Sequence, residues 1–320
     1  MHAILARQSG GPEVLEFAEV ERPTPGPGQL LVKVAATGVN FIETYQRGGM
    51  YKVAYPFTPG SEAAGTVEEV GEGVDGFAVG SRVATAEGQK CYAEYTVLDA
   101  DKALPVPDGV DLHTAAALPL QGMTAHYLIN SSFRVEPGHT VLVHAGAGGV
   151  GLLITQLLKI RGARVITTVS TAEKEDLSRA AGADEVLRYE GFADAVRKLT
   201  NGAGVDVVYD GVGKETFDSS LASLRTRGFL VLFGAASGAV PPVDPQRLNA
   251  GGSLSLTRPK LADFLGNPQE RVWRSSEIFG AVADGSLDVR IGGTYPLAEA
   301  RRAHEDLEGR RTTGKVLLVP

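Results

Sequence analysis

The pattern of apolar and polar positions changes along the chain and first divides it near residue 123. Up to that point, short apolar runs are separated by many glycines and prolines, which is typical of strands joined by tight turns. Strands are expected at 29–38, 65–70, 82–86 and 92–98. We therefore predict a small, irregular β-barrel in this part of the chain.

From about 124 to 261 the pattern becomes a regular alternation of strand and helix. The expected strands lie at 140–145, 164–169, 185–187, 205–209, 228–233 and 253–257, and the expected helices at 151–161, 172–181, 192–200 and 214–224. This alternation predicts a parallel, doubly wound α/β sheet. The tail from 262 to 320 ends in a strand at 314–319, which we expect to rejoin the first domain.

The run from His144 to Gly151 is the most informative segment of the sequence, because it follows an apolar strand and opens an apolar helix. In that context Gly146 allows a tight turn, Gly148 lets the backbone approach a pyrophosphate, and Gly151 lets the helix pack closely. Backbone N–H groups at the start of the helix would face the anion. The segment predicts a dinucleotide site, and the alternative is a glycine-rich structural turn.

The end of the next strand indicates which dinucleotide binds. It reads Val169-Ser170-Thr171 and carries no carboxylate, which NAD sites use to hold the ribose 2′-OH. Lys174 follows closely, and Tyr189 comes after the next strand. Hydroxyl and ammonium groups suit a 2′-phosphate, which a carboxylate would repel. We therefore expect NADPH rather than NADH, although Lys174 is open to a second interpretation as a solvated first-turn lysine.

Composition narrows the class of protein. The chain has 320 residues, of which 43% are hydrophobic and 22% charged, as in an ordinary globular protein. Its net charge of −7 argues against nucleic acid as the main partner. A single cysteine, Cys91, excludes an internal disulfide and a cysteine-only zinc site. No apolar run is long enough to span a membrane, and the apolar start at residues 1–6 is too short for a signal peptide. We therefore expect a cytoplasmic enzyme.

Several motifs carry a resemblance to a known family. They are Thr37–Tyr45, Gly60–Gly65, Ala145–Gly151, Val208–Gly213, Gly234–Val240, Thr257–Pro259 and Thr312–Pro320. Together with the order of barrel, Rossmann domain and tail, they resemble the medium-chain dehydrogenase/reductase superfamily, and within it the zinc-independent quinone oxidoreductases of the zeta-crystallin group. The resemblance covers essentially the whole chain.

The resemblance implies the architecture. A GroES-like barrel domain would span 1–123, completed by 262–320, and a Rossmann domain binding NADPH would span 124–261. It also implies a homodimer. The stretch 253–257 alternates like an edge strand, which could pair with its copy, whereas the alternative is a covered edge in a monomer.

Metal independence is expected from the residues that the chain lacks. Zinc-dependent relatives place a cysteine and a histidine where this chain has Asn40 and Ser61, and amide and hydroxyl groups are poor zinc ligands. Glu62 is then expected to be structural, and the six scattered histidines are expected at the surface or at caps. Without a Lewis acid the substrate must accept hydride readily, as a quinone does on becoming an aromatic hydroquinone.

The remaining site residues come from the resemblance. It places Asn40, Tyr45 and Tyr51 near nicotinamide and substrate, where Asn40 could hydrogen-bond a quinone oxygen and the tyrosines could stack on a flat ring or donate a proton. The alternatives are a turn residue and barrel-packing aromatics. The cofactor positions are Phe41, Ile42, Thr44, Tyr45 and Thr124, then Gly149 and Val150 at the pyrophosphate, then Gly211, Val212, Phe233, Gly234, Ala235, Leu256 and Arg258, and finally Arg310, or its neighbour Arg311, beside Lys174 and Tyr189 at the 2′-phosphate.

Three functions remain open at this stage. The first is an NADPH:quinone oxidoreductase, and the second is an NADPH-dependent reductase of double bonds in enones or alkenals. The third is a non-enzymatic NADPH-binding protein, structural or RNA-binding. The acidic composition argues against RNA, and a complete set of cofactor residues argues against a purely structural role.

Overall fold

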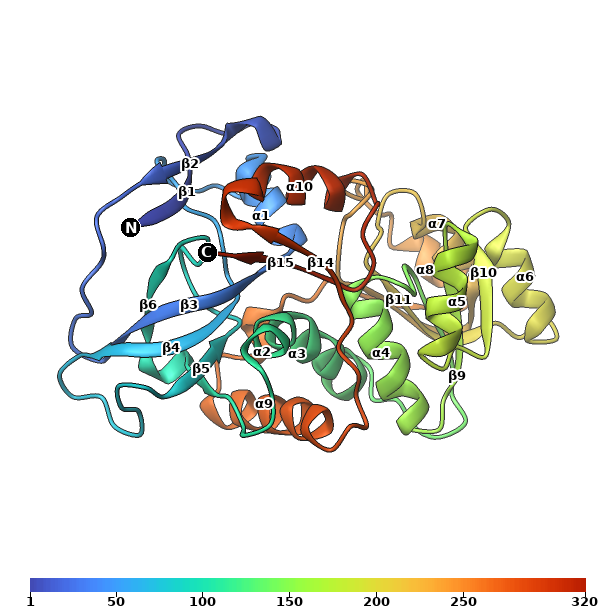
Figure 1. Cartoon of the computed structure of the whole chain (residues 1–320). Coiled ribbons are helices and arrows are strands. Elements are labelled where there is room, and N and C mark those ends of the chain that lie inside the picture. Colours follow the sequence, from blue (N-terminus) through green and yellow to red (C-terminus); the bar gives the residue numbers. More distant parts are fainter. The chain divides into compact units, whose positions relative to one another are not determined.

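The chain divides into two units in the computed structural model, which describes residues 1–320 (Figure 1). The first unit comprises Met1–Met123 and Asn267–Pro320, and the second comprises Thr124–Gly266.

The second unit is built on one parallel sheet of six strands. Its strands are β8 (Thr140–Val143), β9 (Arg164–Val169), β10 (Glu185–Arg188), β11 (Val205–Asp210), β12 (Leu224–Leu232) and β13 (Ser255–Thr257). Their spatial order is β10-β9-β8-β11-β12-β13. Strands β9 and β10 are added on one side of β8 and strands β11 to β13 on the other, so the switch point lies between β8 and β11. This is the doubly wound sheet predicted from the alternating pattern. Ligands of such sheets bind at the carboxyl ends of the strands beside that switch point.

Helices cover both faces of this sheet. They are α4 (Gly149–Ile160), α5 (Ala172–Ala180), α6 (Phe192–Leu199), α7 (Phe217–Ser223) and α8 (Gln246–Ala250). In Figure 1, α4 and α5 lie side by side, while α6 packs beside α7. Phe192, Val196 and Phe217 of α6 and α7 pack on Leu142 and Val208 of the sheet. Because both faces are covered, the strands are nearly continuous apolar runs.

One predicted helix boundary was wrong for a clear physical reason. The expected helix 214–224 begins only at Phe217. The carboxylate of Asp210 accepts hydrogen bonds from the backbone N–H groups of Val212 and Gly213, each at 2.9 Å, and from the Thr216 hydroxyl. These bonds hold residues 211–216 in a turn and delay the start of α7.

The first unit is largely antiparallel. A two-stranded sheet pairs β1 (His2–Ala6) with β2 (Leu15–Glu19). The larger sheet follows the path β14 (Ile291–Pro296), β15 (Lys315–Val319), β3 (Gln29–Val39), β4 (Ala63–Val70), β5 (Arg82–Thr85) and β7 (Leu104–Pro105), and β6 (Tyr95–Asp99) also pairs with β3. The helices are α1 (Phe41–Arg47), α2 (Leu112–Ala117), α9 (Pro268–Ala283) and α10 (Ala300–Glu308), with short helical turns at 12–14, 100–102 and 297–299. Helix α3 (Pro119–Tyr127) crosses the boundary between the units, and the short helical turns at 128–132 and 261–264 belong to the second unit.

The C-terminal strand brings the end of the chain to the start of α1. Strand β15 runs antiparallel to β3, with Val316 opposite Val39 and Leu317 opposite Gly38. Helix α1 follows β3 directly. Lys315 therefore lies beside Asn40, although 275 residues separate them in the sequence.

Candidate active site

The glycine loop after β8 passes close to β9 and to its own helix. The backbone N–H of Gly146 donates to the Thr168 carbonyl at 3.0 Å. A Cβ on Gly146 would lie 2.6 Å from Thr167 Cβ, and one on Gly151 would lie 2.1 Å from the Ala145 carbonyl oxygen. Neither position has room for a side chain, so both glycines are required by close approach.

The same loop presents backbone donors at the start of a long apolar helix. Gly148 is the extended N-cap of α4, and the first turn holds Gly149, Val150 and Gly151. The N–H groups of a first helical turn have no partners within the helix, and the helix dipole places partial positive charge there. With the glycine loop beside it, this end of α4 fits the pyrophosphate of a dinucleotide.

Most of the other cofactor candidates of the second unit follow the ends of parallel strands, and these line one edge of the sheet. Ser170 and Thr171 are exposed after β9, and Thr171 Oγ1 caps α5 by accepting the Lys174 N–H at 3.3 Å. The remaining members are Tyr189 after β10, Gly211 and Val212 after β11, Phe233, Gly234 and Ala235 after β12, Leu256 within β13, Arg258 after it, and Thr124, buried in α3.

Two of these turns touch each other. A Cβ on Gly234 would lie 2.4 Å from the Gly211 carbonyl oxygen, and the Ala236 N–H donates to that oxygen at 3.2 Å. The turns after β11 and β12 therefore form one continuous backbone surface. No carboxylate stands at the tip of β9, where Ser170 and Thr171 follow the strand. The Glu175 carboxylate of α5 lies further along and pairs with Arg188 at 3.0 Å.

A buried polar network beneath this edge was missed by the sequence analysis. His144 Nδ1 lies 2.7 Å from Thr168 Oγ1, and Nε2 lies 2.9 Å from Ser220 Oγ. Ser220 in turn donates to Asp210 at 2.8 Å. Burial lowers the pKa of His144, opposed by the Asp210 carboxylate 4.0 Å away. The network joins the ends of β8, β9 and β11, which carry the cofactor candidates.

The expected surface position of the histidines was wrong for three of them. His126, His144 and His304 are buried. The side-chain partners of His144 and His304 come from distant parts of the chain: His304 contacts Arg47 Nη1 at 2.9 Å and the Tyr92 hydroxyl at 3.1 Å. Spacing along the sequence carries no signal for such partners.

In the first unit, the three candidate catalytic residues lie at and just after α1. The rings of Tyr45 and Tyr51 meet edge to face with centroids 5.8 Å apart, and Tyr51 is 44% exposed. Phe41 stacks obliquely on Tyr45 at 6.2 Å. Thr44 is buried and donates to the Phe41 carbonyl, whereas Phe41, Ile42 and Tyr45 are partly exposed. Arg310 lies in a turn after α10 with a φ of 57°.

Asn40 is buried, and its amide is engaged by the protein. Its Nδ2 donates to Glu62 Oε2 at 3.1 Å and to the Gly38 carbonyl at 3.3 Å, while its Oδ1 accepts from Lys315 Nζ at 2.6 Å. These bonds hold the side chain of Asn40, the residue that is the N-cap of α1. The predicted contact with a substrate oxygen would require one of them to be exchanged.

A charged cluster surrounds Asn40. Lys315 forms an ion pair with Glu62, and both side chains are at most 1% exposed. Glu62 also accepts the Leu120 N–H at 2.7 Å, and Glu43 accepts N–H groups from Asn40 at 2.8 Å and Ser61 at 3.0 Å. A Cβ on Gly38 would lie 2.2 Å from Glu62 Oε2, so the cluster depends on a glycine there. The cluster ties β3, β4 and β15 to α1.

Glu43 gives this cluster a pH dependence. Burial raises its pKa from 4.5 to about 7, against the opposing effect of Lys315. Below pH 4.5 the Glu43 carboxyl is protonated in both the folded and the unfolded chain, and its full contribution to stability is present. As the pH rises from 4.5 through about 7, the unfolded chain releases the proton before the folded chain does, so this stability is lost. We expect the free energy of unfolding to fall by up to about 3 kcal/mol between about pH 5 and 8.

Urea denaturation across this range measures the effect. In Glu43→Gln most of the fall should disappear, whereas the exposed control Glu72→Gln should keep the wild-type slope. Equal slopes in wild type and Glu43→Gln would show that another group titrates.

No group of three His, Cys, Asp or Glu side chains in residues 1–320 is arranged to hold a metal ion. Ser61 and Asn40 instead contact Glu43, Glu62 and Lys315. None of the helices has the length and apolar content needed to cross a bilayer.

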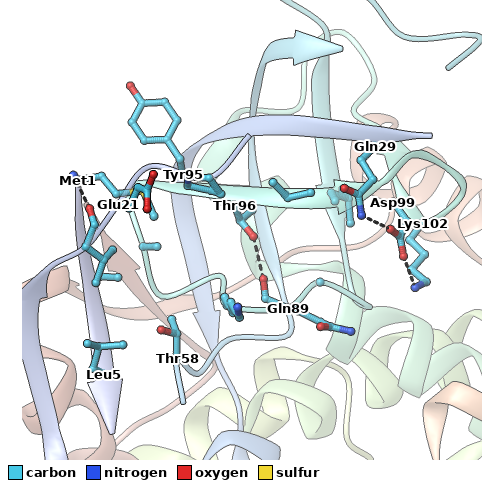
Figure 2. Close-up of a pocket in the computed structure, with 18 of the residues that line it drawn as sticks. Met1, Leu5, Glu21, Gln29, Thr58, Gln89, Tyr95, Thr96, Asp99 and Lys102 are labelled. Atoms are coloured by element: carbon cyan, nitrogen blue, oxygen red, sulfur yellow. Dashed lines mark hydrogen bonds and ion pairs between the residues drawn. The ribbon is translucent and has the colours of Figure 1, made fainter. Parts of the chain in front are cut away.

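A cavity of about 570 Å³ in the first unit contains none of the predicted site residues (Figure 2). Met1, Leu5 and Thr58 line one part, and Gln29, Asp99 and Lys102 line another. The polar groups of its wall bond to one another: Gln29 donates to Asp99 at 3.0 Å, and Lys102 pairs with Asp99 at 2.6 Å. We assign no role to this cavity.

Comparison with known proteins agrees with this fold. Residues 26–108 match the alcohol dehydrogenase GroES-like domain, and residues 149–269 match the zinc-binding dehydrogenase family. A quinone oxidoreductase of Pseudomonas aeruginosa is 44% identical over 97% of each chain, and a 2-haloacrylate reductase of a Burkholderia species is 41% identical over 99% of this chain and 98% of that one. A mycobacterial protein solved in complex with NADPH is 55% identical over the full length of both chains, with a TM-score of 0.98.

The fold and the dinucleotide site define a medium-chain dehydrogenase/reductase. Within that superfamily the chain belongs to the quinone oxidoreductase family, as its identity to curated members over nearly the whole length shows. The predicted family resemblance and the predicted pairing of a Rossmann domain with a GroES-like domain are thereby confirmed.

Proposed function

We propose that the protein is an NADPH:quinone oxidoreductase. The observation that carries the proposal is the glycine loop at the start of α4 beside a β9 end that offers Ser170, Thr171 and Lys174 but no carboxylate. The quinone oxidoreductases among its relatives and the NADPH complex of the mycobacterial protein support it.

In this proposal the residues of the second unit hold NADPH. Backbone N–H groups of Gly149 and Val150 bind the pyrophosphate, and Lys174 and Tyr189 bind the 2′-phosphate, a role also proposed for Arg310. Thr124 and the turns after β11, β12 and β13 bind the nicotinamide half. When bound, NADPH supplies the hydride, and the protein aligns donor and acceptor and excludes water.

In the first unit, Asn40, Tyr45 and Tyr51 are the proposed catalytic residues. The edge-to-face pair of Tyr45 and Tyr51 offers a flat ring surface and phenol protons to a quinone. Asn40 fixes the start of α1, and it reaches a quinone oxygen by exchanging one of its present partners.

A second candidate function is favoured by one comparison. The 2-haloacrylate reductase is nearly as similar to this chain as the quinone oxidoreductases are, and its name indicates reduction of an activated double bond. Paired assays with quinones and enones separate the two functions, because the cofactor and the protein are the same in both.

We further propose a cytoplasmic homodimer that pairs through β13, which lies at the edge of its sheet.

Replacing Lys174 by alanine tests the cofactor assignment. A charge-assisted hydrogen bond to phosphate is worth about 1.5–3 kcal/mol, so NADPH affinity should fall about tenfold or more while NADH affinity stays nearly constant. The measurement is fluorescence titration with each cofactor. Lys198→Ala, at an exposed lysine of α6, is the matched control and should change neither affinity. Equal losses for NADPH and NADH would show that Lys174 does not read the phosphate.

A further inference from the structure

Arg188 is a cation at the end of β10 that the sequence analysis did not use. In the parallel pairing of β9 and β10, Arg188 lies opposite Val169, the last residue of β9. Ser170 directly follows the end of β9. Arg188 therefore lies level with the strand end that meets the ribose 2′-substituent in dinucleotide-binding folds.

The guanidinium of Arg188 is held at that strand end by two bonds. Nη1 donates to the Thr171 carbonyl, and Nη2 donates to Glu175 Oε2 at 3.0 Å. The side chain is 43% exposed. Since a guanidinium has five N–H donors, these two bonds leave capacity for an anion on the solvent side.

The carboxylate that Arg188 contacts is shared with a second arginine. Glu175 Oε1 accepts from Arg179 Nη2 at 2.9 Å, one turn along α5. Glu175 is therefore shared between two guanidiniums, and it engages only part of the donor capacity of Arg188. The two ion pairs also reduce the repulsion between the Glu175 carboxylate and a phosphate bound at this strand end.

We propose that Arg188 is a specificity residue for NADPH, with its guanidinium binding the 2′-phosphate from the side of β10. The inference rests on the proposed function, and adds a residue to it. The planar fork of arginine matches phosphate oxygens two at a time, and the bond to Thr171 holds the fork in place before the ligand arrives.

The experiment measures binding of NADPH and NADH to Arg188→Gln, to Arg179→Gln and to the wild type. In Arg188→Gln we expect the Kd for NADPH to rise about tenfold or more, with the Kd for NADH unchanged within about twofold. Arg179 shares the same carboxylate but lies a turn away, so Arg179→Gln should leave both values within about twofold. Equal changes for the two cofactors in Arg188→Gln, or no change, would overturn the proposal.

Two further measurements sharpen the result. Competition by 2′-AMP should weaken in Arg188→Gln while competition by 5′-AMP does not, which separates the phosphate from the adenosine. In Arg188→Gln the Glu175 carboxylate loses one of its two arginine partners, so the double variant of Arg188→Gln with Glu175→Gln should regain part of the lost NADPH affinity. An NADPH affinity in the double variant as low as that of Arg188→Gln would contradict this arrangement.

The outcomes for Arg188 and for the proposed function are distinguishable. If wild type prefers NADPH and Arg188→Gln loses that preference, the inference stands even where quinones are not reduced. If quinones are reduced and Arg188→Gln still prefers NADPH as the wild type does, the inference fails and the proposed function stands.

Discussion

Replacing Lys315 by methionine is expected to lower the free energy of unfolding by about 3–5 kcal/mol. Lys315 and Glu62 are at most 1% exposed, and Lys315 is the cation that balances the Glu62 carboxylate and binds the Asn40 amide at 2.6 Å. Methionine keeps much of the volume but leaves the carboxylate buried without its ion-pair partner. Urea denaturation at neutral pH measures the loss.

Two controls separate the buried charge from the packing. In Lys315→Met combined with Glu62→Gln, part of the lost stability should return because no unpaired charge remains. Lys260 pairs with Asp263 at 3.2 Å on the surface, where the two side chains are 71% and 62% exposed, so Lys260→Met should cost less than about 1 kcal/mol. A cost for Lys315→Met as small as that for Lys260→Met would contradict a stabilising role for the buried pair.

Replacing Gly151 by alanine is expected to weaken NADPH binding by roughly a hundredfold. The added Cβ would lie 2.1 Å from the Ala145 carbonyl oxygen, so either the glycine loop or α4 must move. Overpacking of this kind costs about 1–3 kcal/mol, and the displaced groups are those proposed to bind the pyrophosphate. NADPH and NADH should lose affinity equally, because both carry the pyrophosphate.

Gly280→Ala is the matched control for this change. Gly280 lies within α9, and a Cβ there would have no atom within 4 Å. Alanine at that site should leave cofactor binding unchanged and should raise stability by about 0.5–1 kcal/mol through helix propensity. Full retention of NADPH affinity in Gly151→Ala would show that the loop does not hold the pyrophosphate.

Local patterns predicted the fold and the dinucleotide loop well. A buried strand or a tight glycine turn is specified by a few consecutive residues, so the sequence shows it directly. Examples are the apolar runs of β8, β9 and β11 and the glycines at 146, 148 and 151. The start of α7 was misplaced because its cause, the Asp210 carboxylate, acts through hydrogen bonds that composition does not reveal.

The return of the C-terminal strand to the first domain was predicted, but the individual side-chain contacts between distant segments could not be. Lys315 opens an apolar strand at the end of the chain, and only its pairing with β3 brings it to Asn40. The register of β10 against β9 brings Arg188 to the end of β9. His144 contacts Ser220, which is 76 residues away in the sequence. A sequence pattern records neither register nor such partners.

The most direct test of the central claim is the oxidation of NADPH by the purified protein with a panel of simple quinones, with conjugated enones assayed in parallel and NADH as the paired control. We expect rapid turnover with quinones and NADPH, and slower turnover with NADH or with enones. Turnover with enones alone would move the function to double-bond reduction, and NADPH binding without turnover of either class would contradict the proposed enzyme.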